Sequence, residues 1–287
     1  MDNSLPPKSR QGIYKTRLDQ LLTDRACFSS REKAQSEILL GNILVNGRKE
    51  TKPGKQVPSD ASIEVLKTDC PYVSRGAFKL KGALEDFGLS VSGGVCCDFG
   101  ASTGGFTEIL LQNGARQVTC VDVGYGQLDW RLRQDPRVVV CERTNVRYLT
   151  FASFGHFFDF ICGDLSFISL KWILPVASAL LAENAPSIFL IKPQFELEPN
   201  KNVKGIVREP AYHIEAIERT IAIALESGLI PEKLSFSHIK GTKGNVEYVI
   251  LLRKGRPLED RIGKPRLREV VNEAERFFLE NAEGAKR

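Results

Sequence analysis

Two lysines and two acidic residues stand at positions that the packed core of an α/β protein does not favour. Lys79 lies in the amphipathic stretch SRGAFKL, Asp164 ends the apolar run FICGD, Lys192 ends IFLIK, and Glu247 precedes the apolar run YVILL. A lysine that is desolvated beside a second cation has a lowered pKa and can accept a proton. Each residue alone is equally consistent with a surface charge or a structural ion pair. Together they indicate a site for proton transfer.

A glycine-rich turn follows the apolar run GVCCDF and opens a predicted helix. Its spacing, Gly100-x-x-x-Gly104-Gly105, differs from the G-x-G-x-x-G pattern that seats a dinucleotide pyrophosphate, which argues against a dehydrogenase. The turn is instead similar to the S-adenosylmethionine loop of Rossmann-like methyltransferases, and this resemblance implies S-adenosylmethionine as the cofactor.

The same resemblance assigns roles around the turn. Asp98 would hold the amino end of the methionine, Asp122 at the end of the next run would accept the ribose hydroxyls, and Asn145 would flank the adenine. The predicted cofactor-binding residues are Asp98, Gly100, Ser102, Thr103, Gly104, Gly105, Phe106, Asp122, Asn145 and Asp164.

The elements that position these residues are predicted for residues 71–255. Apolar runs rich in Val, Ile, Cys and Phe alternate with helical stretches, which predicts an α/β fold with a Rossmann-like, doubly wound parallel sheet. We expect helices near 170–182 and 211–227 and a last strand over 246–252. Asp164 and Lys192 then fall at carboxyl ends of strands, where open sheets place their sites. Lys79 falls on a helix whose predicted buried stripe is Ala77, Leu80, Leu84 and Phe87.

Residues 13–70 carry a separate, small α+β pattern between a predicted flexible tail, 1–12, and the α/β region. Helices are predicted for 17–22 and for the stretch after Ser30, strands for 43–45 and 62–65, and a tight turn at Asn46-Gly47. The segments RLDQLL, SSREKAQSEILLGNILVNG and IEV resemble the S4-like RNA-binding domain. That resemblance implies docking on structured RNA, since helix N-termini and arginine side chains suit phosphates. The basic residues selected for it are Arg17, Arg31, Lys33, Arg48 and Lys55, and the alternative is a solvated basic face.

The order of the four charged residues resembles the Lys-Asp-Lys-Glu tetrad of the FtsJ-type RNA ribose 2′-O-methyltransferases. The segments SRGAFKL, DFGASTGGF, CGDLSF, IKPQFE and GNVEYV carry this resemblance. With the S4-like domain, the chain is similar to the TlyA family, the haemolysin A group, whose members methylate cytidine 2′-hydroxyls in 16S and 23S ribosomal RNA. The resemblance implies Lys192 as the base, with Lys79 orienting the hydroxyl and lowering the pKa of Lys192. Asp164 would position Lys192, and Glu247 would tether Lys79 or the ribose.

Composition excludes several other classes of protein. With 42% hydrophobic and 26% charged residues, the 287-residue chain is typical of globular proteins. No apolar stretch reaches the roughly 18 residues of a membrane helix, and no secretion signal is present, so we expect a cytoplasmic protein. The seven cysteines have no paired metal-ligand spacing and the three histidines are scattered, so no metal is expected. The net charge of +5 permits an anionic partner without requiring one.

Two other functions remain open at this point. A non-enzymatic RNA- or ribosome-binding factor with a vestigial methyltransferase domain would also carry these segments, and cofactor binding would distinguish it. A membrane-lytic protein, as the haemolysin name suggests, has no spanning segment to support it, and liposome leakage would test it. The sequence leaves open the nucleotide, the ribosomal subunit, the oligomeric state and the role of residues 256–287, a C-terminal tail whose amphipathic segment could form a helix.

Overall fold

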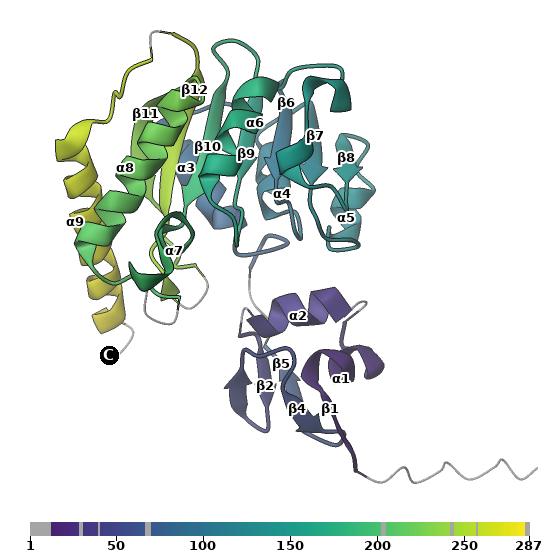
Figure 1. Ribbon diagram of the computed structural model, residues 1–287. Coiled ribbons are helices and arrows are strands. Elements are labelled where there is room, and N and C mark those ends of the chain that lie inside the picture. Colours follow the sequence, from purple (N-terminus) through teal and green to yellow (C-terminus); the bar gives the residue numbers. More distant parts are fainter. Residues whose placement is uncertain are drawn as a thin grey trace, which may run out of the picture. The chain divides into compact units, whose positions relative to one another are not determined.

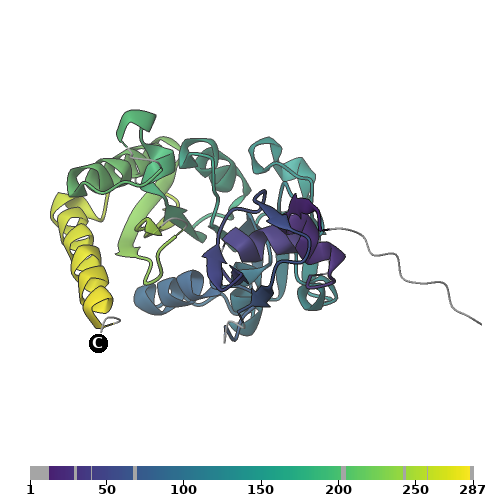
Figure 2. The ribbon, with the colours of Figure 1, turned by 90° about the horizontal axis from the view of Figure 1, so that it is seen from below.

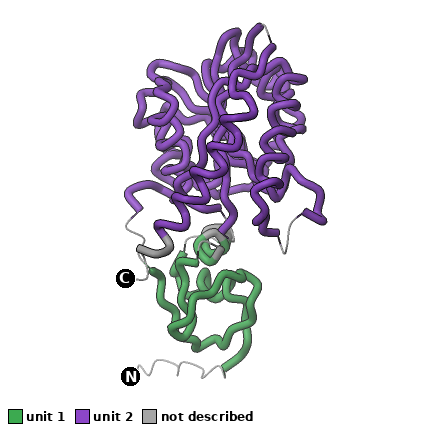
Figure 3. The backbone as a smooth tube through the Cα atoms, turned by 90° about the vertical axis from the view of Figure 1, so that its left-hand side faces the viewer, with its two compact units in different colours: residues 1–69 green, residues 70–287 purple. Residues whose placement is uncertain are grey.

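The computed structural model describes residues 13–28, 31–39, 41–66, 70–201, 205–241, 244–256 and 258–284. The chain divides into two compact units, Met1–Asp69 and Cys70–Arg287 (Figure 3). Each unit has a hydrophobic core of its own. The predicted tail, 1–12, lies outside the described residues.

The small unit consists of short helices and strands. Its elements are β1 (Lys15–Arg17), α1 (Leu18–Asp24), α2 (Arg31–Leu39), β2 (Ile43–Val45), β3 (Arg48–Glu50), β4 (Gln56–Pro58) and β5 (Ile63–Val65). Strand β2 pairs antiparallel with β3 and β5, and β1 pairs antiparallel with β4. Asn46 and Gly47 have φ angles of 51° and 73°, as the predicted tight turn requires. The β1–β4 pair was not predicted, because three residues are too few to show an alternating pattern.

The large unit is built on one sheet of seven strands within its described residues. The strands are β6 (Val95–Phe99), β7 (Gln117–Val121), β8 (Val138–Cys141), β9 (Phe160–Gly163), β10 (Pro186–Ile191), β11 (Leu229–Phe236) and β12 (Tyr248–Lys254). Their order across the sheet is β11-β12-β10-β9-β6-β7-β8. The five neighbouring strands β10, β9, β6, β7 and β8 are parallel to one another, whereas β12 runs antiparallel to both β10 and β11. The α/β fold is confirmed, and its sheet ends in an antiparallel pair.

Helices cover both faces of this sheet (Figures 1 and 2). One face carries α3 (Ala77–Phe87), α4 (Gly105–Gln112) and α5 (Trp130–Arg133), and the other carries α6 (Leu174–Leu180), α8 (Pro210–Glu226) and α9 (Gly263–Gly284). Short helices connect these elements: η1 (Val146–Tyr148), η2 (Phe151–Ser153), η3 (Leu170–Trp172), α7 (Pro193–Glu196) and η4 (Pro199–Lys201). The predicted helices near 170–182 and 211–227 correspond to η3 with α6 and to α8.

Alternate side chains of the strands enter two separate cores. Phe99 and Phe189 pack with residues of α6, α8 and α9. Cys96 and Leu190 point to the other side and pack with residues of α3 and α4. Cys96, Cys97, Cys120 and Cys162 are buried and unpaired, as expected of cysteines that serve as small hydrophobic residues.

Strand β11 was not predicted from the sequence. It contains Pro231, which cannot donate to a sheet ladder, and the register shifts between Pro231 and Lys233. The strand tolerates this residue because it lies at the edge of the sheet. Helix α9 packs beside it and buries Leu267, Val270 and Val271 in the core. Among the described residues, no helix is long and apolar enough to cross a membrane.

Candidate active site

The register of the sheet brings the selected residues to one edge. Phe99 pairs with Val121 and with Gly163, Phe189 pairs with Gly163, and Ile191 pairs with Tyr248. The residues directly after the parallel strands therefore meet at the carboxyl edge. Because β12 is antiparallel, the residue before its first position lies at this same edge. The residues so placed are Gly100, Asp122, Asp164, Lys192 and Glu247.

Helix α3 contributes Lys79 to this edge. The predicted stripe is buried, and it fixes the helix against the sheet: Ala77, Leu80, Leu84 and Phe87. Lys79 Nζ then lies 2.8 Å from Asp164 Oδ2 and 2.6 Å from Glu247 Oε2. The ammonium group is thus held between two carboxylates that come from distant parts of the chain.

Lys192 completes a ring of alternating charges. Its Nζ lies 2.7 Å from Asp164 Oδ1 and 3.9 Å from Glu247 Oε1. It also donates a hydrogen bond of 2.8 Å to Ser166 Oγ. The structure therefore brings together all four residues selected from the sequence, and all four side chains are largely buried.

The charges of the ring support each other. Burial alone would lower the pKa of Lys79, but the carboxylates of Asp164 and Glu247 raise it above its ordinary value. Burial alone would raise the pKa of Asp164, but Lys79 and Lys192 hold it well below its usual range. Lys79 is therefore a fixed cation and Asp164 a fixed anion. Of the two lysines, Lys192 has the weaker contacts with the carboxylates, because its second carboxylate, that of Glu247, lies 3.9 Å away.

The glycine loop between β6 and α4 is tightly packed. Gly104 has a φ of 96°, and a Cβ on it would lie 2.3 Å from Leu132 Cδ1. A Cβ on Gly105 would lie 2.4 Å from Ser74 Oγ and 2.9 Å from the backbone nitrogen of Ala77. Packing against α5 and against the start of α3 therefore requires both glycines. Their predicted role at the cofactor stays a prediction.

The other residues selected for the cofactor have different surroundings. Asp98 is buried and accepts bonds of 3.0 and 2.8 Å from the backbone N–H and hydroxyl of Thr107. The Phe106 side chain is buried in the core, so its backbone is what it can offer a ligand. Thr103 is partly exposed in the loop. Asn145 accepts a bond of 3.1 Å from the backbone N–H of Arg147 and so caps η1.

Asp122 connects the glycine loop with the turn after β7. Its Oδ2 accepts a bond of 2.8 Å from the backbone N–H of Ser102, and its Oδ1 accepts a bond of 2.7 Å from that of Gly124. Ser102 has a φ of 49° and an exposed side chain. The carboxylate is half-buried, and each oxygen retains a further acceptor position.

Two residues of the edge escaped sequence analysis. Ser166 accepts the bond from Lys192, and its place two residues after Asp164 was the available signal. Phe167 is 90% exposed with a φ of 64°, a backbone conformation that aromatic residues rarely adopt. Its ring centroid lies 5.2 Å from that of Phe195, which follows Lys192 by three positions. An exposed phenylalanine, packed on a partly buried one, therefore stands beside the ring of charges.

The basic residues selected in the small unit have mixed surroundings. The buried carboxylate of Asp19 lies 2.9 Å from Arg17 Nη2 and 3.0 Å from Arg31 Nε. Lys55 pairs with Glu50. Arg48 is exposed in the β2–β3 hairpin, and the side chain of Lys33 lies outside the described residues. Arg17 and Arg31 thus also stabilise the unit, while each keeps more than two fifths of its side chain exposed.

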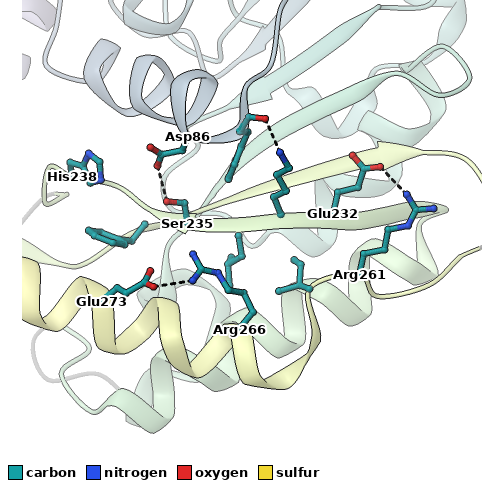
Figure 4. A pocket seen from close by; sticks show the side chains of 12 residues that line it. Asp86, Glu232, Ser235, His238, Arg261, Arg266 and Glu273 are labelled. Carbon is teal, nitrogen blue, oxygen red and sulfur yellow. Dashed lines mark hydrogen bonds and ion pairs between the residues drawn. The ribbon is translucent and has the colours of Figure 1, made fainter.

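A pocket of about 490 Å³ lies elsewhere in the large unit, between α3, β11 and α9 (Figure 4). The charged groups that line it have partners within the lining: Arg266 donates to Glu273 and Arg261 lies against Glu232, whereas Asp86 accepts from Ser235 and Lys233 donates to the carbonyl of Phe87. None of the residues that line the pocket belongs to the ring of charges or the glycine loop. It is therefore distinct from the carboxyl-edge site.

Comparison with known proteins identifies the class to which this arrangement belongs. Residues 72–254 match the family model described as FtsJ-like methyltransferase, and residues 16–63 match the S4 domain. The fold and the site therefore define a methyltransferase of the FtsJ-like type that carries an S4 domain.

Individual relatives narrow this class. The chain is 46% identical over 240 residues to the YqxC protein of Bacillus subtilis, covering 83% of this chain and 85% of that one. It is 42% identical over 241 residues to the 16S/23S rRNA (cytidine-2′-O)-methyltransferase TlyA of Mycobacterium tuberculosis, covering 83% and 90%. A solved structure described as a hemolysin from Streptococcus thermophilus matches with a TM-score of 0.74 and 38% identity, over 94% and 98%. The chain belongs to the TlyA family of FtsJ-like methyltransferases.

The donor set at the carboxyl edge fits S-adenosylmethionine. Asp122 lies at the end of β7 with acceptor positions left on both oxygens, which suits a ribose diol. Asp98, which is buried, accepts both Thr107 bonds on Oδ2, and a second acidic side chain at this edge suits a ligand that carries an ammonium group. The turn between these acids carries Gly100, whose φ of 80° permits a close approach of the backbone to a ligand.

Proposed function

We propose that this chain transfers a methyl group from S-adenosylmethionine to the ribose 2′-hydroxyl of a nucleotide, a cytidine, in 16S or 23S ribosomal RNA. The observation that carries the proposal is the placement of Asp164 between two lysines at the carboxyl edge, 2.8 Å from one ammonium and 2.7 Å from the other. Family membership and the names of the relatives support the substrate. A ribosomal substrate also favours a cytoplasmic location.

Lys192 is the proton acceptor in this proposal. A ribose hydroxyl is a weak acid, so its proton must be removed as the new oxygen–carbon bond forms. Lys79 is held by two carboxylates that keep it protonated, so it cannot serve as the base. Lys192 has one close carboxylate and a hydrogen bond to Ser166, and it takes the hydroxyl proton in this proposal.

The other three residues orient the reactants. Lys79 donates to the ribose hydroxyl and fixes its position, Asp164 holds both lysines, and Glu247 holds Lys79. When bound, S-adenosylmethionine supplies a methyl group that its sulfonium already activates. Asp98, Asp122 and the loop backbone would hold the cofactor beside the ring of charges, so that its methyl group would meet the 2′-hydroxyl oxygen that Lys79 positions. The hydroxyl would lose its proton to Lys192 as it accepts the methyl group.

The surroundings of the ring suit an RNA substrate. The exposed ring of Phe167, which packs on the partly buried Phe195, offers a stacking surface for a base whose ribose enters the ring of charges. The S4 domain brings exposed basic side chains at Arg17, Arg31 and Arg48, and such side chains contact phosphates. The small unit would thus provide affinity for structured RNA and the large unit the chemistry.

The test is methyl transfer from labelled S-adenosylmethionine to separated ribosomal subunits that lack the modification. We expect label in an alkali-resistant 2′-O-methyl cytidine, and we expect Lys192→Ala to abolish it while cofactor affinity is retained. Lys81→Ala is the matched control, because Lys81 is an exposed lysine on α3 that pairs with Glu85. Cofactor binding without label on either subunit would contradict the ribosomal substrate. The absence of cofactor binding would instead favour an RNA-binding factor without activity.

A further inference from the structure

Gly241 lies so close to the Glu247 carboxylate that no side chain fits between them. A Cβ on Gly241 would lie 1.9 Å from Glu247 Oε1 and 2.5 Å from its Cδ, whereas real Cβ contacts essentially never fall under 3.0 Å. The backbone of Gly241 is itself fixed, because its N–H donates to the carbonyl of Asn245 at 2.9 Å and its carbonyl accepts from Gly244 at 3.0 Å. The carboxylate is therefore enclosed between this backbone and the ammonium of Lys79, 2.6 Å away.

The residue after Glu247 is anchored on the opposite side. The hydroxyl of Tyr248 lies 3.0 Å from His213 Nδ1, and His213 Nε2 lies 3.2 Å from the carbonyl oxygen of Val207. A carbonyl can only accept, so Nε2 carries the ring proton and Nδ1 accepts from the tyrosine. Burial lowers the pKa of His213, which agrees with a neutral ring. Tyr248 and His213 are 1% and 6% exposed.

These contacts determine where Glu247 lies. Tyr248 is the first residue of β12, and neighbouring residues of a strand point to opposite faces. Tyr248 therefore ties the start of β12 to α8, while Glu247 extends toward Lys79 from the other face. Within the described part of the chain, the polar contacts of His213 and Gly241 are to residues outside the ring, so each acts on the ring through Glu247 and its strand.

We propose that Gly241 and His213 are positioning residues for methyl transfer. Gly241 leaves the space that the Glu247 carboxylate occupies, and His213, through Tyr248, holds the strand end from which that carboxylate reaches Lys79. The proposal rests on the proposed function, since the ring that these residues align is the one assigned there to the 2′-hydroxyl.

The first test is Gly241→Ala in the full chain. The added methyl group must push the Glu247 carboxylate aside, so we expect kcat to fall about 100-fold, as for reacting groups misplaced by about 1 Å. The Kd for S-adenosylmethionine should stay at the wild-type value. Gly82→Ala is the matched control, because a Cβ on Gly82 in α3 would meet only His238 Nδ1, at 3.9 Å. We expect wild-type kcat from this control.

A double variant shows whether Gly241 acts through Glu247. Gly241→Ala should lower the Tm of the wild-type chain, whereas a Glu247→Ala chain lacks the carboxylate that the methyl group strikes and should not lose further Tm when Gly241→Ala is added. Adding Gly241→Ala to Glu247→Ala should change neither Tm nor residual kcat. Equal losses of Tm in the two backgrounds would overturn the role of Gly241, and this readout does not need an active enzyme.

The second test concerns His213 and uses a conservative rescue. Tyr248→Phe and His213→Ala both remove the bond between the two side chains, and His213→Ala also removes the bond to Val207. Tyr248→Phe should therefore lower kcat no more than His213→Ala does, and the double variant should lose no more than His213→Ala alone. His213→Gln should recover kcat, because an amide can both accept from the tyrosine and donate to the carbonyl. Multiplied losses in the double variant would overturn this role.

The outcomes separate the two proposals. An inactive wild-type enzyme on ribosomal subunits would contradict the proposed function, while the Tm comparison would still decide whether Gly241 acts through Glu247. An active wild-type enzyme with undiminished kcat in Gly241→Ala and His213→Ala would overturn the positioning proposal and leave the proposed function standing.

Discussion

Thr107 donates two hydrogen bonds to a single oxygen of Asp98, one from its backbone N–H at 3.0 Å and one from its hydroxyl at 2.8 Å. The pair joins the end of β6 to the first turn of α4, where a helix favours a carboxylate. Asp98 therefore holds together the two elements that flank the glycine loop, in addition to the role in cofactor binding that we propose.

This burial makes the stability of the protein depend on pH through Asp98. Burial raises the pKa of Asp98 from 3.8 to about 7, against the opposing effect of the Thr107 bonds. The folded state then holds a proton that the unfolded chain releases, so stability is lost as the pH rises through this window. The side chain of Asp98→Asn cannot ionise, so its stability lacks this dependence on pH. The free energy of unfolding of the variant, relative to that of wild type, should therefore rise by about 3 kcal/mol from about pH 5 to about pH 8. Urea unfolding at both pH values measures this, and a constant difference would contradict it.

Gly105, the last glycine of the loop, is expected to be required for stability as well as for binding. Gly105→Ala places a methyl group 2.9 Å from the backbone nitrogen of Ala77, which cannot move without shifting α3. We expect a loss of about 1–3 kcal/mol in the free energy of unfolding. Gly82→Ala should instead stabilise by about 0.5–1 kcal/mol, since it replaces a glycine inside a helix. Denaturant unfolding of the two variants compares them directly, and an equally stable Gly105→Ala would refute the packing argument.

Phe167 is expected to lower the stability of the protein through its strained backbone and to support activity through its phenyl ring. Phe167→Ala removes the ring and keeps the positive φ, whereas Phe167→Gly removes the ring and the strain. The glycine variant should therefore be more stable than the alanine variant by about 1 kcal/mol. Both should lose kcat/KM on RNA by about tenfold or more, the value of one stacked base, with cofactor affinity unchanged. If the two variants differ in activity as well as in stability, the phenyl ring of Phe167 is not the group that the RNA contacts.

The arginines of the small unit are expected to separate into two kinds. Arg48→Ala should weaken RNA binding, reduce its salt dependence by about one unit of slope, and leave stability unchanged. Arg31→Ala removes a partner of the buried Asp19 and should lower both RNA affinity and the thermal stability of this unit. Titrations at several salt concentrations, with thermal unfolding in parallel, distinguish the two. An unaltered salt slope in Arg48→Ala would exclude Arg48 from the RNA contact.

Sequence could locate the ring of charges because its members lie at the ends of clear patterns. Asp164 and Lys192 directly follow apolar runs, and Lys79 interrupts a helical stripe, so each stands out from its neighbours. Ser166 and Phe167 belong to a loop whose conformation sets their roles, and no periodic pattern signals a positive φ at an aromatic residue. They were found only in the structure.

Contacts between distant segments account for the remaining differences. The glycine pair was attributed to a ligand alone, because its clashes with Leu132 and Ser74 depend on how α5 and α3 pack. Strand β11 was missed because Pro231 argues against a strand, and only its edge position allows it. Arg17 and Arg31 were selected for their charge, although Asp19, the buried residue that they share, lies in the same short motif as Arg17.

Lys79 and Glu247 lie 168 residues apart in the chain, and Glu247 directly precedes the last strand of the sheet. Domains fold as the chain is synthesised from its amino terminus, so Lys79 is synthesised long before Glu247, the second carboxylate that pairs with it. Until β12 inserts beside β10, one side of the ring is open. If the ring acts as we propose, a nascent or truncated chain that stops before this strand should be inactive.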